Sequence, residues 1–462
     1  MRRAREVVAI AAVAAAALVG VAFDASSEDV SAPAAGGEEP AFIQRSEICP
    51  PQARGLEARA HVAVASSATE PVMLAVGPGA PRRLHPGNLV ARAAGASETT
   101  VTGYGGRVAA SLSTSVAEPV PGAAAARCSQ EASSTWYFPA GSSALGADER
   151  LLLVNPFGDE AVARVVFYTP EGLVAKANLA DVAVPAGRSV EVAVNDFVLR
   201  EPLLSAAVRV TRGRVVAWRA ELDDGDRGSG AHMSLGAPAA SREWYFPAGV
   251  LGPGYDERIT LTNPSPDEAV VTITLANDRR VVQPPELVEL AVAPESSRVV
   301  ALADIGGAPR RAHDVSAWVT SANAVPVIAE RTVRAAVARR AGVASEVGAT
   351  QPARRWLVGP AALRPSRDAV AVMNPGADDA SVTVTLLRAR GGALRPRALR
   401  GIEVPAGLRA TISLQRWTRG EALGASVAAD RGVVAERWSY SGGDSDLVAL
   451  MGTPVTPSAP GS

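Results

Sequence analysis

Hydrophobic and polar residues alternate with a period of two in three similar stretches of this chain. The stretches begin at Asp148, Asp256 and Arg367 and read DERLLLVNPFGDEAVARVVFY, DERITLTNPSPDEAVVTITLA and RDAVAVMNPGADDASVTVTLL. Apolar residues at every second position, with Thr between many of them, are typical of β-strands that bury one face. The Asn-Pro pair inside each stretch predicts a turn between two strands, because Pro cannot donate to a strand ladder.

The Asn-Pro turns recur at the spacing of a small domain. Their asparagines, Asn155, Asn263 and Asn374, lie 108 and 111 residues apart. A period of this length is too long for a solenoid repeat and suits a domain. We therefore expect three copies of one domain.

A shared hexapeptide opens the copies. It reads WYFPAG at 136–141 and 244–249, and WLVGPA takes its place at 356–361. Aromatic residues make up only 4% of the chain, so chance is a poor explanation for the repetition. We expect the hexapeptide to form the first strand of each copy, with Trp136 and Trp244 covering one end of the core. Stacking on a ligand is the alternative role for these rings.

Each copy contains about seven short alternating segments and no amphipathic helix. This pattern predicts an all-β chain of tandem immunoglobulin-like antiparallel β-sandwiches. The residues expected to face the cores are Leu153, Val165, Phe167, Leu261, Ile273, Leu275, Val372, Val384 and Leu386.

The predicted domain organisation follows from these copies. The segments are a signal anchor or signal peptide (1–24), a flexible linker (25–47), a divergent N-terminal β-domain (48–132), three β-sandwich repeats (133–240, 241–352 and 353–455) and a disordered tail (456–462). The divergent domain, called the first unit below, has strand-like segments but neither the hexapeptide nor the Asn-Pro turn. The other three are called repeats 1, 2 and 3.

The N-terminus has the pattern of an export segment. Arg2, Arg3 and Arg5 precede an uncharged apolar run from Val7 to Phe23. Such a run after basic residues is typical of a segment whose amino end stays in the cytoplasm. It is long for a cleaved signal and short for a spanning helix, and no small-x-small cleavage site follows it. We favour an uncleaved signal anchor over a cleaved signal peptide, and either over a buried Ala-rich helix.

The chain has two cysteines, Cys49 and Cys128, which bracket the first unit. Export places them in an oxidising compartment, so we expect them to form a disulfide. Two unlinked thiols are the alternative. This low cysteine count excludes a Cys-rich zinc scaffold.

Little in the sequence points to catalysis or to a cofactor. The chain has no Gly-x-Ser-x-Gly elbow, no His-Glu-x-x-His helix and no phosphate-binding loop, so we expect no catalytic residue, cofactor or metal. A net charge of −1 gives no electrostatic case for nucleic acid. The four histidines fall at unrelated repeat positions and are expected to be surface or edge residues, with a ligand or catalytic base as the alternative: His61, His85, His232 and His313.

Two charged features recur between copies. The Asp-Glu-Arg triplets at 148–150 and 256–258 are expected to be solvated turns with a local ion pair; paired acids for glycoside hydrolysis are the alternative. Arg219, Arg331 and Arg437 align in the closing strands. We expect them to form ion pairs on a sheet face or to cover a neighbour with their stems, and a carboxylate or phosphate clamp is the alternative.

Two acidic Gly-rich segments follow the closing strands of repeats 1 and 3, DDGDRGSG at 223–230 and SGGDSDL at 441–447. We expect polar connections there, with calcium binding as the alternative.

The succession WYFPAG, DERLLLVNPFGDEAVARVVFYTPEG, VPAG and VVAWR resembles a repeat of bacterial secreted and surface proteins. That repeat has an aromatic opening, an Asn-Pro-Gly-like turn, a Pro-x-Gly turn and a closing VVAER. With the export segment and the early Cys49, the chain resembles an actinobacterial secreted family known as domain of unknown function 5719. Trp218 departs from the pattern that Glu330 and Glu436 follow. The resemblance brings no catalytic residues and implies a surface, binding or structural role.

The sequence therefore predicts a non-enzymatic, exported cell-envelope protein, attached to the membrane through its N-terminal segment. Its tandem β-sandwiches would act as a scaffold that binds an envelope protein or a cell-wall polysaccharide. The alternatives are an accessory or targeting subunit of a wall-modifying enzyme and, after that, a glycoside hydrolase.

Overall fold

The computed structural model describes residues 44–455, except 55–57, 67, 69, 105–107, 117–119, 226–227, 306–312, 338–339, 362–364, 419–422 and 441–445. Across these residues the chain is all-β, with antiparallel sheets, short 3-10 turns and a four-residue helix, α2 (Gln415–Thr418). No helix in this part is long and apolar enough to cross a membrane. The predicted signal segment 1–24, most of the linker and the tail 456–462 lie outside the described residues.

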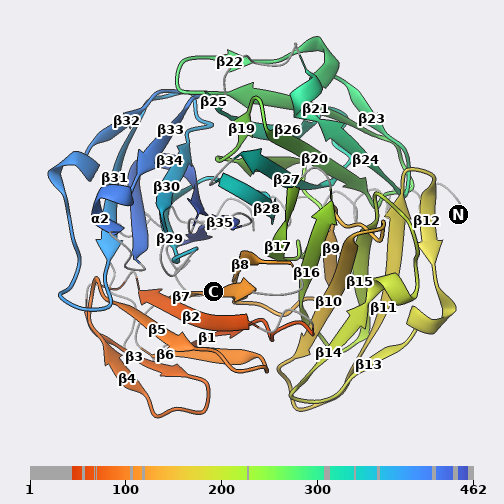
Figure 1. Cartoon of the computed structure of the whole chain (residues 1–462), viewed down its shortest axis with the longest axis horizontal. Helices are drawn as coiled ribbons and strands as arrows, with labels where there is room; N and C mark the ends of the chain where they lie inside the picture. Colours follow the sequence, from red (N-terminus) through yellow and green to blue (C-terminus); the bar gives the residue numbers. More distant parts are fainter. Residues whose placement is uncertain are drawn as a thin grey trace, which may run out of the picture. The chain divides into compact units, whose positions relative to one another are not determined.

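The first unit contains two antiparallel sheets, of order β1-β6-β3-β4 and β5-β2-β7-β8 (Figure 1). Its strands are β1 (Gln44–Cys49), β2 (Ala58–Ser66), β3 (Val72–Val76), β4 (Arg82–Leu84), β5 (Leu89–Ala93), β6 (Thr99–Tyr104), β7 (Val108–Val116) and β8 (Gly122–Arg127). The predicted linker 25–47 ends too late, because residues 44–47 already pair with β6. The polar, acidic composition of this segment concealed a strand in which Glu47 is buried.

Repeat 1 contains one sheet of order β14-β10-β16-β17 and another of order β12-β11-β15-β9, in which β13 also pairs with β11. Its elements are β9 (Thr135–Phe138), β10 (Ala147–Asn155), β11 (Ala161–Thr169), β12 (Gly172–Ala175), η1 (Ala177–Leu179), β13 (Val182–Val184), β14 (Arg188–Ala193), η2 (Val194–Asp196), β15 (Ser205–Arg212), β16 (Val216–Gly225) and β17 (Gly228–Leu235).

Repeat 2 has the corresponding sheets, β24-β20-β27-β28 and β18-β26-β21-β22 with β23 beside β21, and a small pair of β19 and β25. Its elements are β18 (Glu243–Phe246), β19 (Val250–Leu251), β20 (Tyr255–Asn263), β21 (Ala269–Ala276), β22 (Val281–Val282), η3 (Pro285–Leu287), β23 (Leu290–Val292), β24 (Ser296–Ala301), η4 (Leu302–Asp304), β25 (His313–Asp314), β26 (Ser316–Ser321), β27 (Ile328–Val337) and β28 (Arg340–Val347).

In repeat 3 a single long strand, β34, joins the two sheets into one. Its elements are β29 (Ala353–Val358), β30 (Arg367–Met373), β31 (Ala380–Leu387), η5 (Arg397–Leu399), β32 (Ile402–Val404), β33 (Arg409–Ser413), α2, β34 (Gly424–Tyr440), β35 (Leu447–Met451) and β36 (Thr453–Pro454). No named sheet in the described residues crosses the boundaries placed at 132, 240 and 352.

The first unit is a fourth copy of the same fold. Its first strand β1 lies beside β6, as β9 lies beside β15, and β5-β2-β7-β8 repeats the order β14-β10-β16-β17. The sequence concealed this relation, since the first unit lacks both the hexapeptide and the Asn-Pro turn.

The strand order departs from the predicted immunoglobulin-like one. Immunoglobulin domains pair strands B with E and C with F, and these pairs are present as β10–β14 and β11–β15. Their first strand joins B and E, and their last joins C and F. Here β9 pairs with β15 and β16 with β10, so the first strand and the strand that corresponds to immunoglobulin strand G have exchanged sheets. Alternation along a strand cannot distinguish the two orders, because both bury the same faces.

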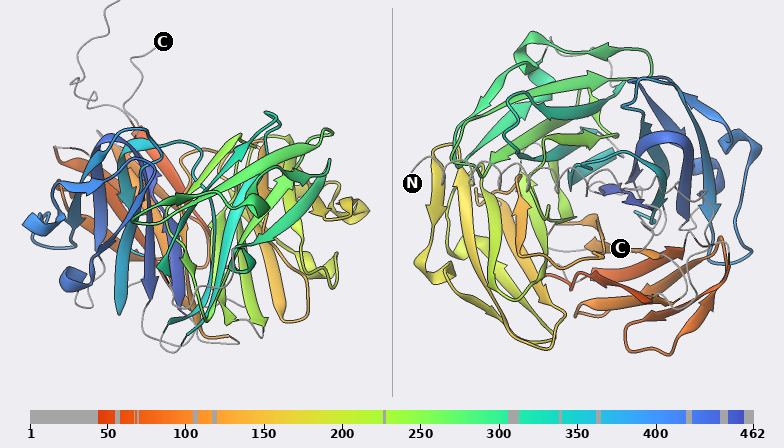
Figure 2. Two further views of the ribbon diagram at one scale, coloured as in Figure 1. Left: turned by 90° about the horizontal axis from the view of Figure 1, so that it is seen from above. Right: turned by 180° about the vertical axis from the view of Figure 1, so that it is seen from behind.

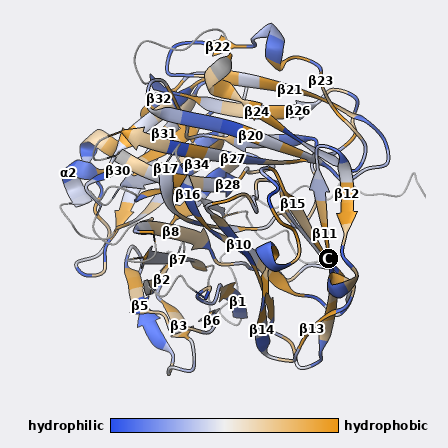
Figure 3. Ribbon diagram, turned by 45° about the vertical axis from the view of Figure 1, so that its right-hand side comes forward, coloured by the Kyte–Doolittle hydropathy of each residue, from blue (hydrophilic) through white to orange (hydrophobic). Residues whose placement is uncertain are grey.

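The nine residues predicted to face the cores are each at most 4% exposed, which confirms the strand register. The prediction that each strand buries only one face was wrong for β10 and β20, however. Leu152 and Val154 of β10, and Thr260 and Thr262 of β20, are buried on the opposite face. The neighbouring unit supplies the cover: the Thr262 hydroxyl donates to Ser205 of repeat 1 over 2.9 Å. Figure 3 shows apolar residues along strands of every unit.

The Trp that opens each repeat is a core residue, as predicted for the first two. Trp136, Trp244 and Trp356 are each 1% exposed. Their indole N–H groups donate to the backbone oxygens of Val215, Val327 and Val433 at 2.8, 2.8 and 2.7 Å. Each ring thereby ties the first strand of its repeat to the residue just before β16 or β27, or to Val433 within β34.

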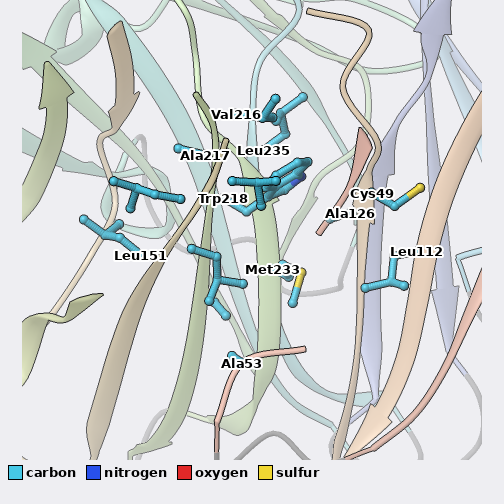
Figure 4. Close-up of a cluster of buried hydrophobic side chains, with 14 of the residues drawn as sticks. Cys49, Ala53, Leu112, Ala126, Leu151, Val216, Ala217, Trp218, Met233 and Leu235 are labelled. Carbon is cyan, nitrogen blue, oxygen red and sulfur yellow. The ribbon is translucent and has the colours of Figure 1, made fainter. Parts of the chain in front are cut away.

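The contacts between units form a closed series. The innermost strands β8, β17, β28 and β35 contact one another in that order, and β35 contacts β8 (Figures 1 and 2). The first unit is also bonded to repeat 3, where the Leu89 N–H donates to the Arg388 oxygen over 2.8 Å. On its other side it shares a core with repeat 1, in which Trp218 lies near Cys49 and Ala126 (Figure 4).

Candidate functional site

Charged side chains are buried where consecutive repeats meet. Arg219 of β16 reaches from repeat 1 to Glu330 of β27 in repeat 2, with Nη2 donating to Oε1 over 2.6 Å and Nη1 to Oε2 over 3.2 Å. Both side chains are 0% exposed. Glu330 also accepts from the Ala140 N–H at 2.9 Å and the Ser345 hydroxyl at 2.8 Å. These donors provide the compensation that a buried charge requires.

The same arrangement recurs between repeats 2 and 3. Nη1 of Arg331 donates to Glu436 of β34 over 3.1 Å, Nη2 donates to the other carboxylate oxygen, and the Ala248 N–H donates over 3.1 Å. The Arg331 guanidinium also lies 5.9 Å from the ring centre of Phe246 and 5.5 Å from that of Trp438. Cation–π contacts of this kind strengthen when they are desolvated.

These junctions explain why the hexapeptide recurs. The Ala of WYFPAG donates its N–H to the buried Glu of the following repeat. The Gly that follows must lack a side chain: a Cβ on Gly141 would lie 2.4 Å from Glu149 Oε2, and one on Gly249 would lie 2.4 Å from Glu257 Oε1.

The residues at the two ends of the series of repeats make different contacts from those at the two junctions between repeats. Trp218 occupies the position of Glu330 and donates its indole N–H to the Arg127 oxygen of the first unit over 3.0 Å. Its departure from the repeat pattern thus marks the junction with the first unit. At the other end, Arg437 binds Asp368 of its own repeat, with Nε 2.7 Å from Oδ1. The expected ion pairs are present at all three closing arginines, and they are buried because neighbouring elements cover these sheet faces.

The prediction that the two Asp-Glu-Arg triplets form solvated turns was wrong, because they lie within β10 and β20, but the predicted local ion pairs are present. Arg150 does pair locally with Asp148, and Arg258 with Asp256, each at 2.9 Å. The glutamates between them, Glu149 and Glu257, are instead buried at the repeat junctions. Burial, with the nearby Glu221 carboxylate, holds the pKa of Glu149 well above its ordinary value. Burial raises the pKa of Glu257 to about 7.

A cleft of about 290 Å³ opens at the junction of repeats 2 and 3, and we take it as the candidate site. Repeat 2 contributes Ala248, Gly249, Val250, Tyr255 and Asp314; repeat 3 contributes Arg367, Asp368, Ala369, Ala371, Arg409, Thr411, Ser413, Gln415, Trp438 and Tyr440. The rings of Trp438 and Tyr440 lie 6.4 Å apart at 57°. The cleft therefore combines an aromatic wall with polar groups from β30, β33 and α2.

Most charges in this cleft are neutralised within it. The Arg409 guanidinium is 3.3 Å from Asp314 and donates from Nε to the Pro247 oxygen over 3.0 Å, and the Thr411 hydroxyl donates to Asp314. Asp368 is held by Arg437. Arg367 is different, because no acidic side chain in the described residues pairs with its exposed guanidinium.

The remaining predicted sites fall at separate places. Cys49 and Cys128 lie together as a disulfide, with Cα atoms 4.2 Å apart, joining the end of β1 to the segment after β8. His232 lies on β17, an edge strand of its sheet, but it is buried beside Glu221, and burial holds its pKa well below its ordinary value. The other histidines are less buried.

Within the segment 223–230, residues 223–225 at the end of β16 pair with residues 228–230 at the start of β17, and Asp223 pairs with Arg334 at 2.5 Å. Within the described residues no three His, Cys, Asp or Glu side chains are placed to hold a metal. Residues 441–445 of the second acidic segment lie outside the described part.

A second cavity, of about 440 Å³, is lined by segments that connect successive units, among them 235–241 and 347–353. The opening tryptophans Trp136, Trp244 and Trp356 contribute to its wall. Its wall also carries polar side chains, among them Arg127, Glu131 and Gln351, but it does not include the Trp438–Tyr440 pair of the cleft between repeats 2 and 3.

Comparison with known proteins identifies the family. The family of unknown function DUF5719 matches residues 90–242 and 215–457. The chain belongs to the DUF5719 family. The two matched ranges overlap at the end of repeat 1, and together they include part of the first unit and all three repeats. DUF5719 carries no assigned activity.

Other comparisons add no functional argument for this DUF5719 protein. No curated protein matches it significantly. A Thermotoga maritima protein, solved as "Thermotoga maritima 1070", is similar at 15% identity over 22% of this chain and 96% of its own, with a TM-score of 0.20. The Anabaena sensory rhodopsin transducer is similar at 20% identity over 20% of this chain and 97% of its own, with a TM-score of 0.18.

Sequence reasoning missed the cleft residues Arg409, Trp438 and Tyr440. They occur in repeat 3 alone, so the search for recurring positions passed over them. A signal was available in the closing strand, where Trp438 and Tyr440 stand at alternate positions among few aromatic residues in the chain.

Proposed function

We propose that this protein is a non-enzymatic, exported component of the cell envelope that binds a cell-wall polysaccharide in the cleft between repeats 2 and 3. The observation that carries the proposal is the pairing of Trp438 and Tyr440 with exposed polar groups at one junction. Ligand sites combine an apolar or aromatic wall with a few placed polar groups, and a sugar ring offers matching apolar and hydroxyl faces.

Export is supported by two independent features. The N-terminal run 7–23 has the composition of a signal anchor, with a cleaved signal peptide as the alternative. The pairing of Cys49 with Cys128 suits an oxidising compartment, because disulfides are rare in the reducing cytosol. The β-sandwich units would then stand outside the membrane as one scaffold.

Polysaccharide is favoured over an envelope protein as the partner. Small-molecule sites have volumes of about 300–1,000 Å³, and the cleft of about 290 Å³ is close to the lower end of that range, whereas protein partners bind over broad surfaces. The cleft instead suits a small ring-shaped group. A role beside a wall-modifying enzyme, as its targeting subunit, uses the same binding and remains the alternative.

A glycosidase role has less support. Asp314 and Asp368 are the carboxylates in the cleft, and each is held by an arginine, Arg409 and Arg437 respectively. Glycosidases use a pair of carboxyl groups that flank the scissile bond, whereas each carboxyl in this cleft is bound to an arginine.

Co-sedimentation of the full chain with purified cell wall tests the proposal. We expect binding that falls when Trp438 is replaced by Leu, while Trp417→Leu on α2, outside the cleft lining, keeps it. Absence of sedimentation with wall would refute the proposal, and release of reducing sugar would favour the glycosidase.

A further inference from the structure

We infer that the cleft recognises a sugar ring that carries a carboxylate, with Arg367 binding the carboxylate and Trp438 supporting the ring. This inference rests on the proposed function and names the ligand class for the same site.

The charge balance of the cleft points to an anionic ligand. Arg409 is paired with Asp314, and Asp368 is paired with Arg437, so these four groups contribute no uncompensated charge. Arg367 remains as an exposed guanidinium on the cleft wall, without an acidic partner in the described part of the chain. A planar guanidinium can bind a carboxylate through two parallel N–H···O bonds.

The position of Arg367 is fixed by the sheet. It begins β30 and pairs with Tyr440 of β34, and the Ser439 hydroxyl donates to its backbone oxygen over 3.2 Å. The backbone that carries the guanidinium is therefore held rigidly beside the aromatic pair. A rigid site loses less conformational freedom on binding than a loop would.

The aromatic wall is also held in place. The Arg331 guanidinium lies 5.5 Å from the centre of the Trp438 ring, and Arg331 is itself bound to Glu436. The Trp438 ring is thus fixed from the repeat 2 side while it lines the cleft.

Hydroxyl and amide groups complete the ligand class. Thr411, Ser413 and Gln415 are exposed along the same wall, and the Gln415 amide donates to the Ser366 oxygen over 2.5 Å. These groups can exchange hydrogen bonds with ring hydroxyls. The volume of about 290 Å³ lies at the lower end of the range for small-molecule sites, so we expect one acidic sugar residue at a time.

Two matched pairs of sugars test the inference on the full chain. N-acetylmuramic acid differs from N-acetylglucosamine by a carboxylate-bearing ether, and galacturonic acid differs from galactose by oxidation of one carbon. We expect at least one acid to bind at least tenfold more tightly than its neutral counterpart in calorimetric or NMR titration. We expect Arg367→Gln to abolish that preference and Arg416→Gln, the same charge change outside the cleft lining, to keep it.

The outcomes separate this inference from the proposed function. Equal binding of acid and neutral sugars, or a preference that survives in Arg367→Gln, overturns the inference. If wild-type protein sediments with wall but binds neither acid, the proposed function stands and the acidic-sugar inference fails. If it prefers the acids but does not sediment with wall, the acidic-sugar inference stands and the proposed function fails.

Discussion

Removing the cation from the junction of repeats 1 and 2 should destabilise the whole protein. In Arg219→Met, Glu330 keeps the Ala140 N–H and the Ser345 hydroxyl but loses the cation that pairs with it. Breaking one side of a buried pair typically costs about 3–5 kcal/mol. Because two donors remain on Glu330, we expect about 3 kcal/mol.

A surface pair provides the matched control. Arg212 and Glu160 also lie 2.5 Å apart, but their side chains are 63% and 48% exposed. Exposed pairs contribute roughly 0–1 kcal/mol, so Arg212→Met should change the free energy of unfolding by no more than about that amount. The two variants remove the same group and differ in burial.

Urea unfolding followed by tryptophan fluorescence measures the free energy of unfolding of both variants and of the wild type.

The result that would refute this reasoning is specific. If Arg219→Met and Arg212→Met shift the urea midpoint equally, the buried pair contributes nothing beyond a surface one. A double-mutant cycle with Glu330→Gln should give a coupling of at least about 1 kcal/mol, within the range for contacting residues.

Three further outcomes are expected. Burial raises the pKa of Glu47 to about 8, so its contribution to stability is full below about pH 4.5 and is lost as the pH rises towards 8; Glu47→Gln should flatten this part of the stability–pH curve, and an unchanged curve would contradict it. Gly141→Ala should destabilise strongly because its Cβ would meet a buried carboxylate, whereas Gly158→Ala, with nothing within 4 Å, should be tolerated; equal melting temperatures would exclude the clash. Mass spectrometry of unreduced peptides should find Cys49 linked to Cys128, and free thiols on both would rule out the disulfide.

The strands of the repeats could be predicted from sequence because alternation and the Asn-Pro turn are local signals. Asn155 shows why the turn is so regular: its amide donates to the Asp159 and Val184 oxygens at 2.7 and 3.0 Å, and its oxygen accepts from Phe157 at 3.1 Å. Asn263 and Asn374 repeat these contacts. Because the Asn side chain bonds to backbone groups of its own loop, the turn can be recognised from the sequence of one copy.

The burial of the charged residues could not be predicted in the same way. Glu330 and Arg331 are adjacent in the chain, yet they point to opposite faces of β27 and bind different repeats. Nothing within one copy indicates that another copy covers both faces. The cleft was missed for a related reason, since its residues come from two repeats and only one of them carries the aromatic pair.

The closed series of contacts among β8, β17, β28 and β35 has a consequence for how this gene can evolve. Open repeat arrays lengthen or shorten by duplication or deletion, because each unit contacts only its neighbours. Here, deletion of repeat 2 would still place the cation of Arg219 opposite the anion of Glu436, so the charge pairing would survive. The three units that remain could not form a closed series with the same angle between neighbouring units, however. The number of units is therefore set by closure, as in a cyclic oligomer whose subunits have been joined into one chain.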